Sequence, residues 1–230
     1  MVSFLFFPVT LNYSSPVLII MGATKGIVVA SFIMFTLQFF SSLVLGRVFC
    51  GWLCPAAGIQ EACFSICDRP VKTGRADLIK WLIWIPWITI IIVTFAKAGG
   101  FKSIQPLYMF ENGISVDEPQ AYIMYFFIVG VFILLSLIVG RRAFCHYGCW
   151  MAPFMIIGRK IRNLFKWPSL HLKSDEKKCI DCKMCTRVCP MSLDPNAMVR
   201  NRKMENAEWV LCGNCVDVCL KGAIEYGFRS

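Results

Sequence analysis

Apolar residues divide this chain into long hydrophobic runs, short polar turns and a polar C-terminal segment. The runs 26–45, 78–96 and 121–139 are nearly free of charge, and about 20 such residues are needed to cross the hydrocarbon core of a membrane. A fourth run, 4–21, contains two prolines, which predict either a kinked spanning helix or a re-entrant one. The pattern predicts an α-helical multi-pass membrane protein with three or four transmembrane helices.

The charges between these runs predict an orientation. Basic residues gather at 46–47, 69–80 and 140–142, whereas 97–120 carries two lysines against three acidic residues. Cytoplasmic loops hold an excess of Lys and Arg, so the basic turns and everything after residue 140 are predicted to be cytoplasmic.

Between 150 and 167, apolar residues recur at helical spacing while Arg159, Arg162 and Lys166 fall on another face. This predicts an amphipathic helix that either lies at the membrane surface or packs on the C-terminal segment.

Composition agrees with a membrane location. The chain is 57% hydrophobic and 17% charged, and both values depart from those of soluble domains. The net charge is +10, and the charged residues flank the apolar runs. This distribution favours a lipid bilayer over nucleic acid as the partner. Thirteen cysteines that must supply free thiolates indicate a reducing compartment.

Seven C-terminal cysteines follow the spacing of bacterial two-cluster ferredoxins: Cys179, Cys182, Cys185 and Cys189 before a proline, then Cys212, Cys215 and Cys219. By the crossing rule of that motif, one [4Fe-4S] cluster takes Cys179, Cys182, Cys185 and Cys219, and a second site takes Cys189, Cys212 and Cys215. Trp209 stands where a fourth ligand is expected, so the second site is predicted to be a [4Fe-4S] cluster with a non-local ligand or a [3Fe-4S] cluster. The spacing fits zinc knots and secreted disulfide frameworks poorly.

These motifs predict three parts. They are a transmembrane domain at 1–150, an interfacial amphipathic linker helix at 151–172, and a ferredoxin-like α+β iron–sulfur domain at 173–230. The iron–sulfur domain and the Cys-x3-Cys motifs described next are predicted to lie on the cytoplasmic side.

An internal repeat relates residues 42–54 to 136–149, and each copy ends in a Cys-x3-Cys pair: Cys50 and Cys54, then Cys145 and Cys149. Three roles are open for these thiols, namely joint ligation of a metal centre or cluster, redox-active dithiol chemistry, or packing. Duplication at matching depth favours a metal or redox role.

Two further cysteines, Cys63 and Cys67, share the four-residue spacing of these pairs. They are either a pair without chemistry or the source of the ligand that Trp209 cannot provide.

These motifs resemble the NapH/NosR-type membrane ferredoxin family, in which each of two membrane helices ends in Cys-x3-Cys-Pro and a cytoplasmic domain holds two clusters. Trp150 departs from this pattern, because proline is expected there. The resemblance implies electron transfer at the membrane, often between the quinone pool and an electron carrier or reductase.

We expect a membrane-bound iron–sulfur electron-transfer protein, such as a subunit of a quinol-oxidising oxidoreductase, with redox proteins and a quinone as partners. The alternatives are a maturation factor that delivers electrons or metal to another enzyme, and a structural anchor. Trp81, Trp84 and Trp87 are either interfacial anchors or the lining of a quinone site. His146, between two candidate ligands, either assists a metal or a quinone or is a surface histidine, and the surface position is the expected one.

Overall fold

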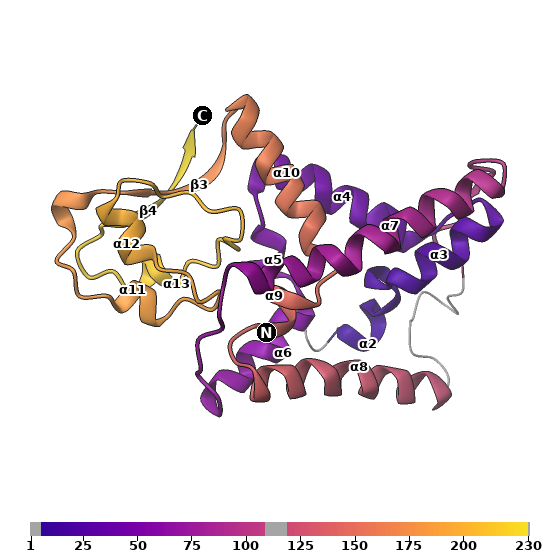
Figure 1. Ribbon diagram of the computed structural model, residues 1–230, viewed down its shortest axis with the longest axis horizontal. Helices are drawn as coiled ribbons and strands as arrows, with labels where there is room; N and C mark the ends of the chain where they lie inside the picture. The colour runs from indigo at the N-terminus through magenta and orange to yellow at the C-terminus, as the bar shows by residue number, and fades with distance from the viewer. Residues whose placement is uncertain (1–5, 109–118, 230) are drawn as a thin grey trace.

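The computed structural model describes residues 6–108 and 119–229, in which a larger helical part and a smaller C-terminal part lie side by side (Figure 1). The elements of the helical part are, in chain order, α2 (Phe7–Thr10), η1 (Asn12–Ser14), α3 (Pro16–Lys25), β1 (Ile27–Val28), α4 (Ala30–Leu45), α5 (Val48–Trp52), α6 (Pro55–Ala62), η2 (Cys63–Ser65), η3 (Arg75–Leu78), α7 (Ile79–Lys97), β2 (Ser103–Ile104), α8 (Pro119–Ile138), α9 (Ala143–Tyr147) and α10 (Ala152–Phe165). α10 packs along α4, and α3 packs along α7.

The C-terminal part contains one two-stranded sheet and several short helices. Its elements are β3 (Ser169–Ser174), η4 (Glu176–Lys178), α11 (Met184–Arg187), α12 (Pro195–Arg200), α13 (Asn214–Asp217) and β4 (Ile224–Arg229). β3 and β4 are antiparallel and pair from Ser169 with Arg229 to Ser174 with Ile224. This sheet joins the two ends of the segment that holds the seven ferredoxin-type cysteines.

The prediction of three or four transmembrane helices is wrong. In the described residues only one helical stretch, Arg75–Lys97, is long and apolar enough to cross a membrane, and Pro16–Lys25, Ala30–Leu45 and Tyr122–Ile138 are shorter. The first run breaks because Ser15 caps a new helix at Pro16. The second is shortened because Ile27 and Val28 pair with β2 instead of joining α4. Local breaks thus remove the length that hydropathy alone suggested.

Buried ion pairs hold the C-terminal part against the helices. Glu208 accepts hydrogen bonds from Arg47 at 2.8 Å and from Lys80 at 2.7 Å, and both basic side chains are almost completely buried. Glu205 pairs with Arg159 of α10, 2.9 Å from its Nε. The basic face of α10 therefore contacts the C-terminal part, and three helical segments are fixed to one loop.

Hydrophobic packing continues across the same boundary. One buried cluster joins Cys50, Cys145 and Met155 of the helical part to Cys189 and Cys215 of the C-terminal part. The two parts consequently share a core.

Within the helical part, α4 and α10 cross at close range. The Cα of Gly158 lies so close to Ser42 that a Cβ would meet the Ser42 Oγ at 1.9 Å.

Candidate iron–sulfur sites

The two Cys-x3-Cys pairs meet at one cavity of about 490 Å³, which Cys50, Cys54, Cys145 and Cys149 line together. In each copy the first cysteine lies on a short helix, α5 or α9, and the second lies beyond its end. The second cysteine of each pair therefore lies in the turn that follows the helix and not on the helix itself. In the described residues no three His, Cys, Asp or Glu side chains are grouped for a single metal ion. A four-iron cube takes one thiolate at each iron, so its ligands need not meet at one point.

The four thiols are close enough to affect one another's ionisation. Burial raises the pKa of Cys54 well above its ordinary value, and the charges of Cys50, Cys145 and Cys149 raise it further. Burial and the charges of Cys145 and Cys50 raise the pKa of Cys149 to about 12. Four thiolates at this site require positive charge to offset them, and the irons of a cluster carry such charge.

Two buried arginines from equivalent positions of the repeat stand beside these thiols. Arg47 and Arg142 are 1% and 0% exposed, and each lies three residues before the first cysteine of its pair. Burial alone would lower the pKa of Arg142, but the charges of Cys145, Glu61 and Cys212 raise it. The Nε–H groups of both arginines are buried without an acceptor in the described part of the chain. Unpaired buried donors are costly, and cluster or thiolate sulfur would satisfy them, so these residues fit an iron–sulfur cluster.

In the C-terminal part, Cys179, Cys182, Cys185 and Cys219 line a second cavity of about 190 Å³. Asp181 and Lys183 have positive φ angles of 57° and 59°, so the backbone turns sharply on both sides of Cys182. Burial raises the pKa of Cys185, and the charges of Cys219 and Cys179 add to it. The structure thus brings together the four ligands predicted for one cluster.

Cys189, Cys212 and Cys215 form a third group. Burial raises the pKa of Cys215 to about 12, with further contributions from the charges of Cys212 and Cys189. Trp209 is buried and lines a small cavity with Gly46 and Arg47, so its side chain packs against the helical part.

Cys63 is buried, and its thiol donates to the carbonyl oxygen of Ile59 at 3.5 Å. Burial and the charge of Cys67 raise the pKa of Cys63. The ligand role of either cysteine stays a prediction.

Direct contacts connect the four cysteines of the repeat with the group of Cys189, Cys212 and Cys215. A Cβ on Gly51, between Cys50 and Cys54, would lie 2.4 Å from the carbonyl oxygen of Val210 and 3.1 Å from the Cα of Cys212. Arg142 donates to the carbonyl oxygen of Cys50 at 3.1 Å. Burial raises the pKa of Cys212, and the charge of Arg142 offsets part of this rise. Arg142 therefore stands between the two groups.

Arg141, the neighbour of Arg142, donates to the carbonyl oxygen of Cys189 at 3.2 Å. Adjacent arginines of the second repeat thus contact both cysteine groups.

Sequence reasoning missed two buried residues beside Cys145. His146 is 0% exposed, contrary to the expected surface position, and its Nδ1 lies 2.9 Å from Asp77 Oδ1. Gln60, also fully buried, places Nε2 at 3.4 Å from Cys145 Sγ. Neither contact has a signal in the local sequence, because each joins residues more than 60 positions apart.

Comparison with known proteins finds a cluster-binding domain in two segments of this chain. Residues 27–73 and 120–168 each match the family model of a 4Fe-4S binding domain. These two segments contain the Cys-x3-Cys pairs of the repeat.

Several known proteins are similar to this chain over most of its length. An uncharacterised protein of Methanocaldococcus jannaschii is 26% identical over 80% of this chain and 66% of its own length. The ferredoxin-type protein NapH of Haemophilus influenzae is 24% identical over 81% of this chain and 64% of its own. The regulatory protein NosR of Stutzerimonas stutzeri is 26% identical over 81% of this chain, which spans only 25% of NosR. No solved structure matches.

These similarities confirm the resemblance to NapH and NosR and the expectation of 4Fe-4S chemistry: this chain is similar to ferredoxin-type electron-transport proteins, and two of its segments match a 4Fe-4S binding domain.

Proposed function

We propose that this protein passes electrons one at a time between a membrane-soluble quinone and a redox protein, through three iron–sulfur sites. Each bound cluster would supply a one-electron couple. The four cysteines of the repeat hold the first site. The group that contains Cys189, Cys212 and Cys215 holds the middle site. The cavity lined by Cys179, Cys182, Cys185 and Cys219 holds the last site.

The main support for this proposal is that the first site lies next to the middle one and the middle site next to the last. Helix α5 at Gly51 touches the backbone of Cys212, and the charge of Cys185, a residue of the last site, also raises the pKa of Cys215 in the middle site. Consecutive sites are thus neighbours. The protein's own contribution is to hold them at fixed spacing in a shared core that excludes water.

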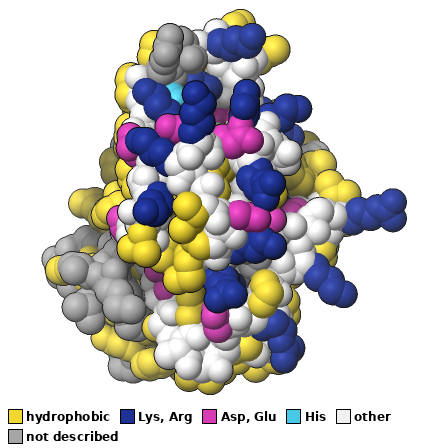
Figure 2. Space-filling model, turned by 90° about the vertical axis from the view of Figure 1, so that its left-hand side faces the viewer, with side chains coloured by type: hydrophobic (Ala, Val, Ile, Leu, Met, Phe, Trp, Pro, Cys, Tyr) yellow, Lys and Arg dark blue, Asp and Glu magenta, His cyan; other side chains and the backbone are white. Residues whose placement is uncertain are grey.

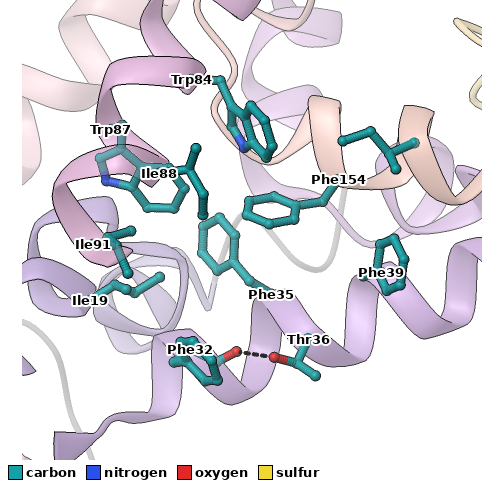
Figure 3. Close-up of a pocket in the computed structure, with 11 residues that line it drawn as sticks. Ile19, Phe32, Phe35, Thr36, Phe39, Trp84, Trp87, Ile88, Ile91 and Phe154 are labelled. Atoms are coloured by element: carbon teal, nitrogen blue, oxygen red, sulfur yellow. Dashed lines mark hydrogen bonds between the residues drawn. The ribbon is translucent and has the colours of Figure 1, made fainter. Parts of the chain in front are cut away.

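An aromatic cavity of about 410 Å³ is the proposed quinone site (Figure 3). Phe35, Trp84, Trp87 and Phe154 are among its lining residues, and the indole N–H of Trp84 is buried with no acceptor among the described residues. Ligand sites are mostly apolar with a few placed polar groups, and a quinone carbonyl would accept this hydrogen bond.

The cavity lies next to the first cysteine site. Met151 lines the four-cysteine cavity and also belongs to the core cluster of Phe35, against which Phe154 and Cys149 pack. The first turn of α10 therefore separates the two cavities.

Surface chemistry supports the two ends of this path. Leu82 and Ile92 on α7 are 71% and 62% exposed, and Ile123 and Phe127 on α8 are 74% and 66% exposed. Exposed apolar side chains gathered on a helix mark a membrane or protein contact, and we place the membrane at these two helices, with the cysteine sites on the cytoplasmic side.

At the other end, Leu220 is 95% exposed beside the last site, whose cavity is also lined by Lys178, Lys183 and Lys221. Lys and Arg side chains are spread over this end of the molecule among fewer acidic ones (Figure 2). An apolar centre with a basic rim suits an acidic redox protein.

The test is anaerobic reduction of the purified, cluster-loaded protein by a reduced quinone analogue, followed by cluster absorbance and electron paramagnetic resonance. We expect bleaching in the wild type and slower bleaching in Trp84→Phe, with no change in Trp81→Phe, whose ring does not line the cavity. Absence of bleaching in a wild type that dithionite does reduce would refute the quinone as a partner.

A further inference from the structure

The two copies of the repeat cross over at the four-cysteine site. Gln60 lies ten residues after Cys50, and Met155 lies ten residues after Cys145. Each contacts the first cysteine of the other copy: Gln60 Nε2 is 3.4 Å from Cys145 Sγ, and Met155 Sδ is 3.5 Å from Cys50 Sγ. Equivalent positions thus face equivalent thiols across the site.

The orientation of the Gln60 amide is fixed by its other partners. Its Oε1 accepts from the backbone N–H of Phe144 at 3.0 Å, and a backbone N–H can only donate, so this atom must be the oxygen. Its Nε2 donates to the carbonyl oxygen of Ala56 at 3.0 Å, which leaves one amide hydrogen for Cys145 Sγ. The side chain is 0% exposed, so water does not compete for this hydrogen.

Met155 cannot act in the same way. Its thioether sulfur has no hydrogen to donate, and the side chain is 1% exposed, so Cys50 faces an apolar, polarisable group where Cys145 faces a donor. Equivalent positions of the repeat therefore give the two first cysteines chemically different neighbours.

We propose that Gln60 is a positioning residue that raises the reduction potential of the centre held by the four cysteines, through its hydrogen bond to Cys145 Sγ. The inference rests on the proposed function, because it requires a cluster at this site. Reduction places more negative charge on the ligand sulfurs, and a donor stabilises that state more than the oxidised one. The centre is consequently asymmetric, with its Cys145 side stabilised for the added electron.

The experiment is a potentiometric titration of the cluster-loaded protein, monitored by electron paramagnetic resonance. Gln60→Met is expected to shift the one-electron reduction equilibrium of this centre by about tenfold toward the oxidised form, or about 59 mV lower in midpoint potential. Met155→Gln, which adds a donor at Cys50, is expected to raise the potential. The double variant exchanges the two side chains and should return close to the wild-type value.

Gln38→Met is the matched control, because Gln38 is a buried glutamine that has no hydrogen-bond partner in the described residues. A wild-type potential in an iron-loaded Gln60→Met would overturn the inference. If Gln60→Met does not assemble the centre, an unchanged or lowered potential in Met155→Gln would overturn it instead. Absence of any wild-type signal that depends on Cys50 and Cys145 would refute the proposed cluster, which is a different failure.

Discussion

Replacing Gly51 by alanine tests the contact between the first and middle sites. The new Cβ would lie 2.4 Å from the carbonyl oxygen of Val210 and 3.1 Å from both the N and the Cα of Cys212. These are backbone atoms, so relief of the clash requires α5 or the C-terminal segment to move. Overpacking of this kind costs about 1–3 kcal/mol, whereas Gly→Ala in a helix such as α5 would otherwise stabilise by about 0.5–1 kcal/mol. The net expectation is a loss of about 1–2 kcal/mol.

The same displacement should separate the two sites and slow electron transfer between them. Denaturant unfolding measures the first effect, and rapid-freeze electron paramagnetic resonance after mixing with reductant measures the second. The control is Gly130→Ala in α8, where a Cβ meets nothing within 4 Å, and it should be neutral or slightly stabilising. If Gly51→Ala matches this control in both assays, the contact does not connect the sites.

Three further outcomes follow from the packing and the ion pairs. Gly158→Ala places a Cβ 1.9 Å from Ser42 Oγ and should lower the free energy of unfolding by about 1–3 kcal/mol; an unchanged melting temperature would contradict the close helix crossing. Glu208→Gln leaves Arg47 and Lys80 buried without their carboxylate and should cost about 3 kcal/mol, measured by urea unfolding against the wild type. Burial alone would raise the pKa of Glu208, but Arg47 and Lys80 lower it below its ordinary value of 4.5. Its stabilising contribution is therefore complete above that value and is lost as the pH falls through the lowered pKa, so unfolding free energy measured between pH 7 and pH 3 should fall less in Glu208→Gln than in the wild type.

The sequence predicts the cysteine groups well because their chemistry is local. Short, fixed spacing places Cys179, Cys182 and Cys185 on one loop, and the duplicated pairs are visible as a repeat. The crossing of Cys219 to this loop follows from the ferredoxin pattern, and the structure places it in the same cavity.

Helix length and burial are less accessible to sequence reasoning. Hydropathy does not show that Ile27 and Val28 pair with a distant segment, and this pairing shortens α4. The buried positions of Arg159 and His146 depend on partners, Glu205 and Asp77, that lie 46 and 69 residues away. Such contacts arise only when the chain folds.

In the proposed electron path, the cysteines of the repeat hold a cluster besides those of the ferredoxin-type segment. The most direct measurement is iron and acid-labile sulfide per chain in the wild type and in Cys50→Ser and Cys145→Ser variants, combined with electron paramagnetic resonance. Three sites predict about 11–12 irons in the wild type and a loss of about four in each variant, with the ferredoxin-type signals retained. About eight irons or fewer in the wild type, unchanged in both variants, would contradict the claim.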